Sequence, residues 1–582
     1  MAKALLLLLI IAVLAGVAFG CYTWMDRLVR SIYDYQPPTK GSPPATTTLT
    51  APLADQIVLV AIDGLRYDAS TMMPQLNALR LQGAHAQLLA WPPSNAQTRW
   101  TSLLTGTGAE LNWAPLFDYG DEWVLPMQID HLFAAFDRAR LKIGIAGSHR
   151  WQKLLNKTPL YLQFFVQDHS PAADAAVTRT AGAFLREFRP DLLLVHLQQL
   201  EEIGLRYGGA SEEYRQAALR CDEHIGAIVA QVDLSHSVLI VVSTYGHLDE
   251  GGHGGTERAT STMPFVMAGA RVIAGEYEPL QLTDIAPLVA SLAGAPIPRS
   301  AEGIWPTQML QLDQLELAEK WTATALQHVR VGNVYLHSIG LGPLSRSAEG
   351  DALVALSSLD VQNYASAAEL GELAVRQTVR EMQQGRRARI WQERTQRGLP
   401  IALALAIFSW IIVHYWDRHT PWCAIAAALA LATYHVLYVR DGNSYTFSRL
   451  GAGGFAALLQ PSIRYAVIAA TVGAAVVTLR LLLRKERSGI SVLLHAYGYG
   501  ILQLYFLAVA AGLLAWWIGP VFQWYVPNLA LAFILVIILM QAMLVALLSI
   551  PVPAVILLLQ RFLWWILRQA RAHLRPPNLS SG

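Results

Sequence analysis

Long apolar stretches in the last third of the chain constrain its fold more than any other feature. After residue 399, such segments run at about 400–416, 421–439, 463–483, 490–518 and 526–549. A helix needs about 20 predominantly apolar residues to cross the hydrocarbon core of a bilayer. Of the 582 residues, 53% are hydrophobic and only 15% are charged. The sequence therefore predicts five membrane spans over 399–550, next to a water-soluble part.

Both ends of the chain also carry membrane signals. Residues 4–20 are apolar and uncharged and follow Lys3, which predicts a signal anchor over 1–33. A cleaved signal peptide is the alternative, and a lipoprotein signal ending at Cys21 fits less well because bulky Phe19 precedes it. Residues 551–582 combine an apolar sequence and paired tryptophans with several arginines. They predict an amphipathic interfacial helix and a basic tail.

The positions of basic residues predict the orientation. One anchor and five spans place both chain ends on the same side of the membrane. A cytoplasmic location puts the basic segment 480–489 and the arginine-rich tail inside, as the positive-inside rule prefers. The large domain between the first two spans is then extracytoplasmic, in an integral protein of the inner or plasma membrane. The basic segment 385–397 is an exception, since it would lie outside.

The water-soluble part has the pattern of an α/β domain. Residues 34–54 are rich in proline and threonine and predict an extended spacer. Stretches of helical composition, such as 123–140 and 211–232, then separate short apolar runs rich in valine and isoleucine. These runs lie at 57–62, 142–147, 191–197, 237–243 and 264–269. The pattern predicts a mixed or parallel sheet flanked by helices over 55–310, followed by a helical stalk over 311–398.

In such folds, ligands bind beyond the carboxyl ends of the strands. The polar residues at these positions are Asp63, Ser148, His149, Gln198 to Glu202, Thr244 and Tyr245. The formal net charge is +2, so nothing suggests a nucleic-acid partner.

Five motifs around these strand ends occur in an order similar to that of the alkaline phosphatase superfamily. They are VLVAIDGLRYD, PPSNAQTRWTSLLTG, LEEIGLRYGGASEEYRQAALRCDEHIGAIV, STYGHLDEGGHGG and LTDIAPLVASLAGAPIPRSAEG. Within that superfamily, the segment most resembles type I phosphodiesterases and the GPI ethanolamine phosphate transferases. The resemblance implies a phosphoryl-transfer site with two zinc ions, which clamp the attacking and leaving oxygens and activate the nucleophile.

The positions that the resemblance assigns to this site are degenerate. Asp63 and His253 match metal ligands, and Glu201 replaces an aspartate. The nucleophile position is Ala96, whose methyl group cannot attack phosphorus. Three further ligand positions hold Leu205, Thr244 and Tyr245. The nucleophile-activating zinc would therefore retain Asp63 alone, which is too few ligands for a tetrahedral site.

The second zinc position is better preserved. It retains Glu201 and His253, and His247 or Asp249 nearby could supply a third ligand. The sequence thus implies either no cofactor or a single zinc ion.

Two hydroxyl residues are fallback nucleophiles. Ser94 and Thr98 flank Ala96, but a shift by two residues displaces the attacking oxygen, and in-line attack tolerates little misplacement.

The retained residues also have structural alternatives. Asp63 could cap a turn, His253 could hydrogen-bond within its glycine-rich loop, and Glu201 could lie at a solvated helix start. Arg99 and the segment 149–151 could contact a phosphate or have no ligand at all.

Two functions follow. The first is a pseudoenzyme: a membrane-anchored binding or assembly subunit of the cell envelope, in contact with the lipid bilayer, protein partners and a lipid-linked or glycan ligand. The alternative is an active metal-dependent phosphodiesterase or phosphoethanolamine-type transferase that acts on lipid-linked or glycan substrates. The joint loss of several ligands, while strand and helix patterns stay intact, favours the first.

Overall fold

The structure is a computed structural model that divides into two compact units. It describes residues 22–31, 34–39, 50–116, 124–414, 420–443, 449–483, 489–519, 521–525, 529–549 and 551–573, with Tyr445 and a few residues between 12 and 20. One unit contains Arg30–Gln392 and Phe522–Ala530, and the other contains Met1–Val29, Glu393–Val521 and Leu531–Gly582. Most of the expected anchor at 4–20 lies outside the described residues.

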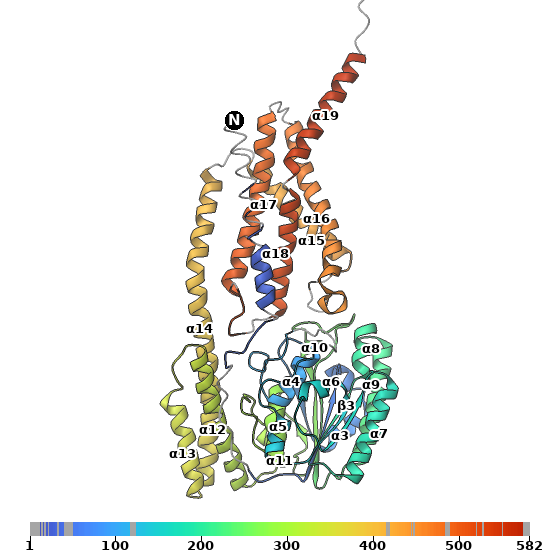
Figure 1. The fold of residues 1–582 in the computed structure, drawn as a ribbon, viewed down its shortest axis with the longest axis vertical. Helices are drawn as coiled ribbons and strands as arrows, with labels where there is room; N and C mark the ends of the chain where they lie inside the picture. Colours follow the sequence, from blue (N-terminus) through green and yellow to red (C-terminus); the bar gives the residue numbers. More distant parts are fainter. Residues whose placement is uncertain are drawn as a thin grey trace, which may run out of the picture. The chain divides into compact units, whose positions relative to one another are not determined.

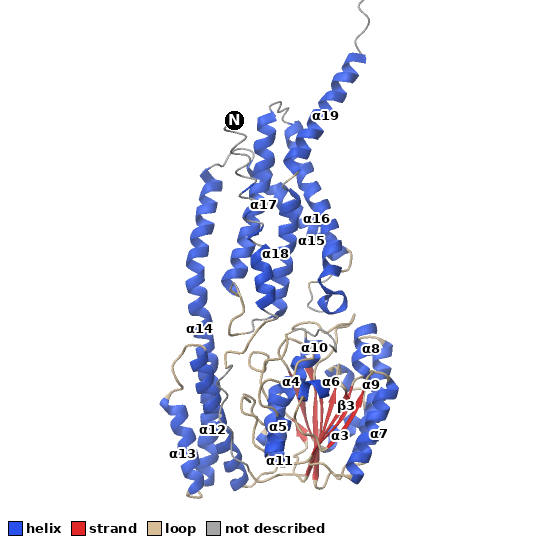
Figure 2. Cartoon of the chain, viewed as in Figure 1, coloured by secondary structure: helices blue, strands red, loops and turns tan. Residues whose placement is uncertain are grey.

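A nine-stranded sheet forms the centre of the first unit (Figures 1 and 2). The strands are β1 Gln56–Ile62, β2 Ala84–Leu89, β3 Ile143–Ser148, β4 Leu162–Val166, β5 Leu192–Leu197, β6 Ser237–Ser243, β7 Thr262–Gly269, β8 Gly275–Glu276 and β9 Leu280–Gln281. Their order is β4-β3-β5-β1-β6-β7-β2-β8, and β9 pairs with β2. Strands β4, β3, β5, β1 and β6 are parallel, whereas β7 is antiparallel to both β6 and β2. The sheet is therefore mixed, and the five predicted strands are confirmed.

Helices cover both faces of this sheet. They are α2 Tyr67–Ser70, α3 Pro74–Gln82, α4 Ala96–Thr105, α5 Leu132–Arg138, α6 Arg150–Leu155, α7 Pro171–Glu187, α8 Gln199–Tyr207, α9 Glu212–Val229, α10 Arg258–Ser261 and α11 Ile285–Ala293. Successive residues of a strand point to opposite faces. Thus Ile57 and Leu59 of β1 share a core with α4, α5, α6 and α11, whereas Val58 and Val60 share one with α3, α7 and α9. Burial on both faces explains why β1 is apolar throughout.

Residues 311–398 are mostly helical, as expected. The helices are α12 Gln314–Ser338, α13 Arg346–Asp360 and α14 Tyr364–His414. A reciprocal capping box between Asp313 and Glu316 begins α12. The helix expected over 123–140 is shorter than predicted, because His131 caps α5 and the helix begins at Leu132.

The protein is an integral membrane protein with four candidate spans among its described residues. These are the apolar part of α14, Thr420–Arg440 (α15), Pro461–Arg480 within α16 Arg449–Leu483, and Gly498–Trp517 within α17 Gly489–Trp517. The fifth expected span coincides with α18 Leu529–Ser549, where Ile534–Ser549 counts as a shorter apolar helix. The last helix is α19 Val552–His573. Its interfacial location and the membrane orientation stay predictions.

Candidate functional site

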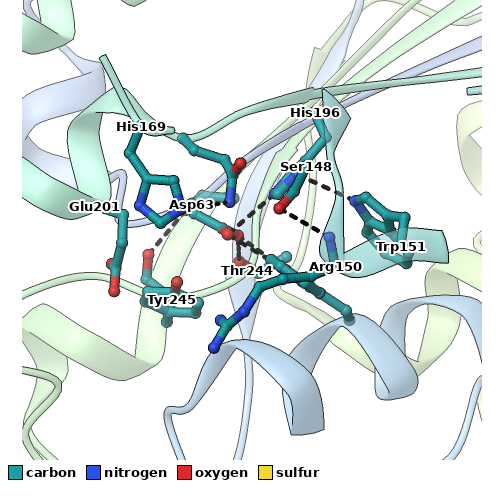
Figure 3. A network of polar contacts seen from close by, with 12 residues as sticks. Asp63, Ser148, Arg150, Trp151, His169, His196, Glu201, Thr244 and Tyr245 are labelled. Carbon is teal, nitrogen blue, oxygen red and sulfur yellow. Dashed lines mark hydrogen bonds and ion pairs between the residues drawn. The ribbon is translucent and has the colours of Figure 1, made fainter. Parts of the chain in front are cut away.

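The candidate site lies beyond the carboxyl ends of three neighbouring strands, where this type of sheet binds ligands. Asp63 follows β1, Glu201 lies in the first turn of α8 after β5, and Thr244 and Tyr245 follow β6. Ala96 begins α4 at the same edge of the sheet. All five residues are buried (Figure 3 shows four of them). The fold thus brings together the residues that the sequence singled out.

Three side chains surround the carboxylate of Asp63, and Figure 3 labels two of them, Thr244 and His196. The indole Nε1 of Trp100 donates to Oδ1 and Oδ2 at 2.9 and 3.1 Å. The hydroxyl of Thr244 donates to Oδ1 at 2.6 Å. Nε2 of His196 lies 3.0 Å from Oδ2. A carboxylate that is only 1% exposed therefore meets its need for partners within the protein.

The tautomer of His196 follows from its second contact. The indole Nε1 of Trp151 lies 3.1 Å from Nδ1 of His196. Because an indole N–H can only donate, Nδ1 accepts and the proton of a neutral ring lies on Nε2, which is near Asp63 but makes no hydrogen bond to it. The rings of Trp100 and Trp151 stack with centroids 4.8 Å apart. The two tryptophans and His196 therefore form a rigid, buried wall beside Asp63.

A second cluster contains Glu201, His247 and His253. One ligand atom from each of these residues lies within 4.8 Å of the others. Nε2 of His247 is 2.9 Å from Oε2 of Glu201, and Nε2 of His253 is 3.3 Å from Oε1. In the described part of the chain, both ring nitrogens of His247 and Oε2 of Glu201 are buried without a hydrogen bond. Such unsatisfied atoms fit a cation between the three side chains.

Two glycines make room for the imidazole of His247. A Cβ atom at Gly204 would lie 2.1 Å from Cδ2 of the ring, and one at Gly64 would lie 2.6 Å from Nε2. Leu205, which stands at a ligand position, is 44% exposed. Asp249, the other predicted source of a third ligand, pairs instead with Arg66 at 2.5 Å. The structure thus brings His247, but not Asp249, to Glu201 and His253.

Electrostatics favour an ionised Glu201 in this cluster. Burial alone would raise the pKa of Glu201, but His253 and His247 outweigh it and hold the pKa at about 2. Asp174 of α7 positions the start of α8, the helix that carries Glu201. Its carboxylate accepts hydrogen bonds from the backbone N–H groups of Gln198 and Gln199 at 3.0 Å. The donor that a cation needs is therefore charged and held in place.

The first turn of α4 presents no free hydroxyl at the nucleophile position. Ala96 is 4% exposed, and Asn95 caps the helix by accepting from the backbone N–H of Thr98. The hydroxyl of Thr98 donates to the Pro115 carbonyl at 2.6 Å, and that of Ser94 lies 3.3 Å from Nη2 of Arg99. Both fallback nucleophiles are thus tied into the protein.

The basic residues near the site also have structural partners. Arg99 is buried and donates through Nε to the Pro93 carbonyl at 2.8 Å. Burial lowers the pKa of Arg99 to about 9, while Tyr245 opposes this shift. Within the segment 149–151, the guanidinium of Arg150 lies 5.9 Å from the ring centroid of Trp100. The expected phosphate contacts of these residues stay predictions.

A family model described as type I phosphodiesterase / nucleotide pyrophosphatase matches residues 142–258, which include β5, β6 and both histidines of the cluster. The α/β unit carries a type I phosphodiesterase domain of the alkaline phosphatase superfamily.

Curated proteins similar to this chain include GPI ethanolamine phosphate transferases. The transferase 2 of Eremothecium gossypii is 27% identical over 297 residues, which cover 45% of this chain and 36% of that protein. The human GPI ethanolamine phosphate transferase 2, catalytic subunit, is 25% identical over 299 residues, which cover 46% of this chain and 29% of that protein. The chain is thus distantly related to these transferases and matches about a third of their length.

A solved structure similar to this one is human ectonucleotide pyrophosphatase / phosphodiesterase 5. It is 13% identical, with coverage of 41% of this chain and 94% of its own, and a TM-score of 0.34.

A pair of zinc ions does not fit the described residues of the phosphodiesterase domain. Zinc needs lone pairs from several ligands. Trp100 and Thr244 instead donate hydrogen bonds to Asp63, whereas Nε2 of His196 lies 3.0 Å from Oδ2 without a hydrogen bond. A cation at this position would face proton donors in place of ligands.

A single metal ion does fit the second cluster of the phosphodiesterase domain. Glu201, His247 and His253 would hold it, and a bound metal would supply Lewis-acid chemistry at that point.

Two of the side chains that surround Asp63, Trp100 and His196, were not predicted from the sequence. His196 is a polar residue within the otherwise apolar strand β5, and a buried polar group needs a partner. A histidine within an apolar strand was therefore the sequence signal that could have identified His196 as part of the site. Nothing in the spacing of Trp100 and Trp151 indicates that they stack beside it.

Proposed function

We propose that this chain is a membrane-anchored pseudoenzyme that keeps the phosphodiesterase fold as a binding or assembly subunit of the cell envelope. The observation that supports this most strongly is the carboxylate of Asp63, which accepts hydrogen bonds from Trp100 and Thr244 and lies 3.0 Å from Nε2 of His196. Without a metal there, no group lowers the pKa of a nucleophile. The methyl group of Ala96 removes the nucleophile itself.

Retained order at the site supports a binding role. The strand ends, the first turn of α4 and the start of α8 are all fixed by buried hydrogen bonds. A lipid-linked or glycan ligand, or a protein partner in an envelope complex, is the class of molecule that an extracytoplasmic domain on membrane spans would meet.

The second candidate is an active phosphodiesterase or phosphoethanolamine-type transferase with one metal. The cluster of Glu201, His247 and His253 supports it, because three donors around one point can hold zinc with an open fourth position. Thr98 or Ser94 would then have to leave its present partner in order to attack.

Hydrolysis of bis(4-nitrophenyl) phosphate by the purified full-length chain, with zinc or manganese added, tests the proposal. The expected result is no turnover above the metal-only background. Turnover that Asp63→Ala abolishes would refute the pseudoenzyme and restore a two-metal site. Turnover that survives Asp63→Ala but is lost in Glu201→Gln and Thr98→Ala would establish the second candidate. Asp249→Asn is the matched control, since this exposed carboxylate pairs with Arg66.

A further inference from the structure

The unit that contains Glu393–Val521 and Leu531–Gly582, here called the membrane unit, holds a row of hydrogen-bonded polar side chains that the proposed function does not use. His435 lies on α15, Tyr445 lies between α15 and α16, and Gln541 lies on α18. Nδ1 of His435 is hydrogen-bonded to the hydroxyl of Tyr445, which lies 3.2 Å from Oε1 of Gln541. Polar groups within membrane spans are costly and commonly mark functional sites.

The amide of Gln541 is incompletely bonded in either orientation. It is 2% exposed, and its Nε2 has no hydrogen-bond partner among the described residues. If the amide is flipped, Nε2 can donate to Tyr445, but Oε1 then has no donor. In either orientation, one polar atom of the buried Gln541 amide therefore lacks a hydrogen bond, which is unfavourable in a bilayer. A group from outside the chain would complete it.

This row of polar side chains begins at His435, on the lipid-facing surface of α15. His435 is half-buried, and its neighbours Val436 and Val439 are 64% and 58% exposed on an apolar helix. α15 ends at Arg440, roughly one and a half turns beyond His435. This depth lies just inside the head-group region of a bilayer. A molecule that reaches His435 from this side comes laterally out of the membrane, so it is a lipid.

The surrounding side chains favour a neutral head group with hydroxyls. The rings of Tyr438 and Tyr445 pack with centroids 4.8 Å apart. Tyr465 donates to Asp441 at 2.7 Å. These groups are phenols and a carboxylate, with no lysine or arginine among the described hydrogen-bonding members, so they do not suit a phosphate. A hydroxyl both donates and accepts, and it can therefore complete Gln541 in either orientation.

We propose that His435, Tyr445 and Gln541 form a binding site for the sugar-like, uncharged head group of a membrane lipid. The site lies in the membrane unit and does not depend on whether the phosphodiesterase domain is catalytic. A hydroxyl of the head group pairs with the Gln541 amide, and the half-buried ring of Tyr445 packs against the ring of the sugar.

Native mass spectrometry of the purified full-length chain tests this site. The chain is incubated with equal amounts of monoglucosyldiacylglycerol, diacylglycerol and phosphatidylglycerol. The expected result is that the glucosyl lipid is retained about fivefold or more over diacylglycerol, since one or two hydrogen bonds correspond to about that factor. Gln541→Leu and Tyr445→Phe should each remove this preference. Tyr445→Phe keeps the aromatic ring, so it provides the test even if Gln541→Leu does not fold.

Gln503→Leu is the matched control. Gln503 is also a buried glutamine of the membrane unit, and its Oε1 likewise lacks a hydrogen bond among the described residues. Its Nε2, however, donates to the Ala427 carbonyl at 3.2 Å and to the Tyr499 hydroxyl at 3.4 Å, outside the group of His435, Tyr445 and Gln541. The preference for the glucosyl lipid should survive this change. Equal retention of all three lipids, a preference for phosphatidylglycerol, or a loss as large in Gln503→Leu would each overturn the proposal.

Discussion

At the residue scale, Asp63 matches a metal-ligand position but has contacts that differ from those of a metal ligand. In the two-zinc site that the resemblance implies, this carboxylate would face a cation. Here it faces an indole, a hydroxyl and an imidazole that all carry protons. A single residue that matches a motif therefore says little about a metal unless its neighbours also offer lone pairs.

Trp100→Phe tests the bond between the indole and Asp63. The change keeps an aromatic ring but removes the N–H that donates to the carboxylate. A hydrogen bond to a buried charge contributes about 1.5–3 kcal/mol, so the free energy of unfolding should fall by about that amount. Denaturant titration of the purified chain measures this. Trp91→Phe is the control, because Trp91 is 80% exposed and should change stability by less than about 0.5 kcal/mol. Equal losses in both variants would contradict the assignment.

Ala96→Thr tests whether the missing nucleophile is the only defect. We expect no hydrolysis of an aryl phosphodiester, because Asp63 has no metal with which to activate the new hydroxyl. The added atoms enter a position that is 4% exposed, so stability should fall by about 1–3 kcal/mol. Measurable turnover in this variant would show that the metal position near Asp63 is intact.

At the element scale, buried carboxylates that cap helices make the stability of the α/β unit depend on pH. Asp284 ends the 3-10 helix Leu282–Asp284 and accepts from the backbone N–H groups of Gln281 and Ile304 at 2.8 Å. Burial raises the pKa of Asp284 to about 7 against the opposing effect of these bonds. The unfolded value is about 3.9.

Between these two pKa values the folded chain binds the extra proton, so stability is lost as the pH rises from about 4 through about 7. We expect Asp284→Asn to have a smaller loss of thermal stability between pH 5 and pH 8 than the unchanged chain. The buried Glu110 and Asp174, whose pKa values burial raises to about 7 and about 6, leave a residual slope. Asp360→Asn, an exposed control on α13, should keep the full slope. An unaltered slope in Asp284→Asn would contradict the assignment.

The strands were predictable where burial on both faces dictated their composition. β1 and β6 are continuous apolar runs because helices cover both faces of the sheet. β2 has the sequence AHAQLL, with alternating burial and no β-branched residue, and β4 is a partly exposed edge strand. Neither has the composition of a buried strand, so the sequence did not reveal them. The antiparallel direction of β7 depends on pairing with β2 and could not be read from β7 alone.

The candidate site was predictable in position but only partly in its contacts. Strand ends located Asp63, Glu201 and the residues after β6, because parallel strands bring their carboxyl ends to one edge. The contacts around Asp63 join residues from four separate segments of the chain. Such pairings are decided by tertiary packing, which no local pattern encodes.

At the scale of the whole molecule, the orientation predicted from basic residues has a direct test. Trypsin added outside intact cells or spheroplasts should cut after Lys40, within the proline- and threonine-rich spacer 34–54. Lys40→Gln should remove that cut. Protection of the spacer until the membrane is opened would place the α/β domain in the cytoplasm, opposite to the prediction.

The central claim is that the position beside Asp63 is closed to metal, whereas the cluster of Glu201, His247 and His253 is the place where one ion fits. The most direct measurement is the zinc content of the full-length chain, combined with anomalous scattering to locate any bound ion. We expect at most one ion per chain, which His247→Ala removes and Asp249→Asn does not. Two ions per chain, one of them ligated by Asp63, would contradict it.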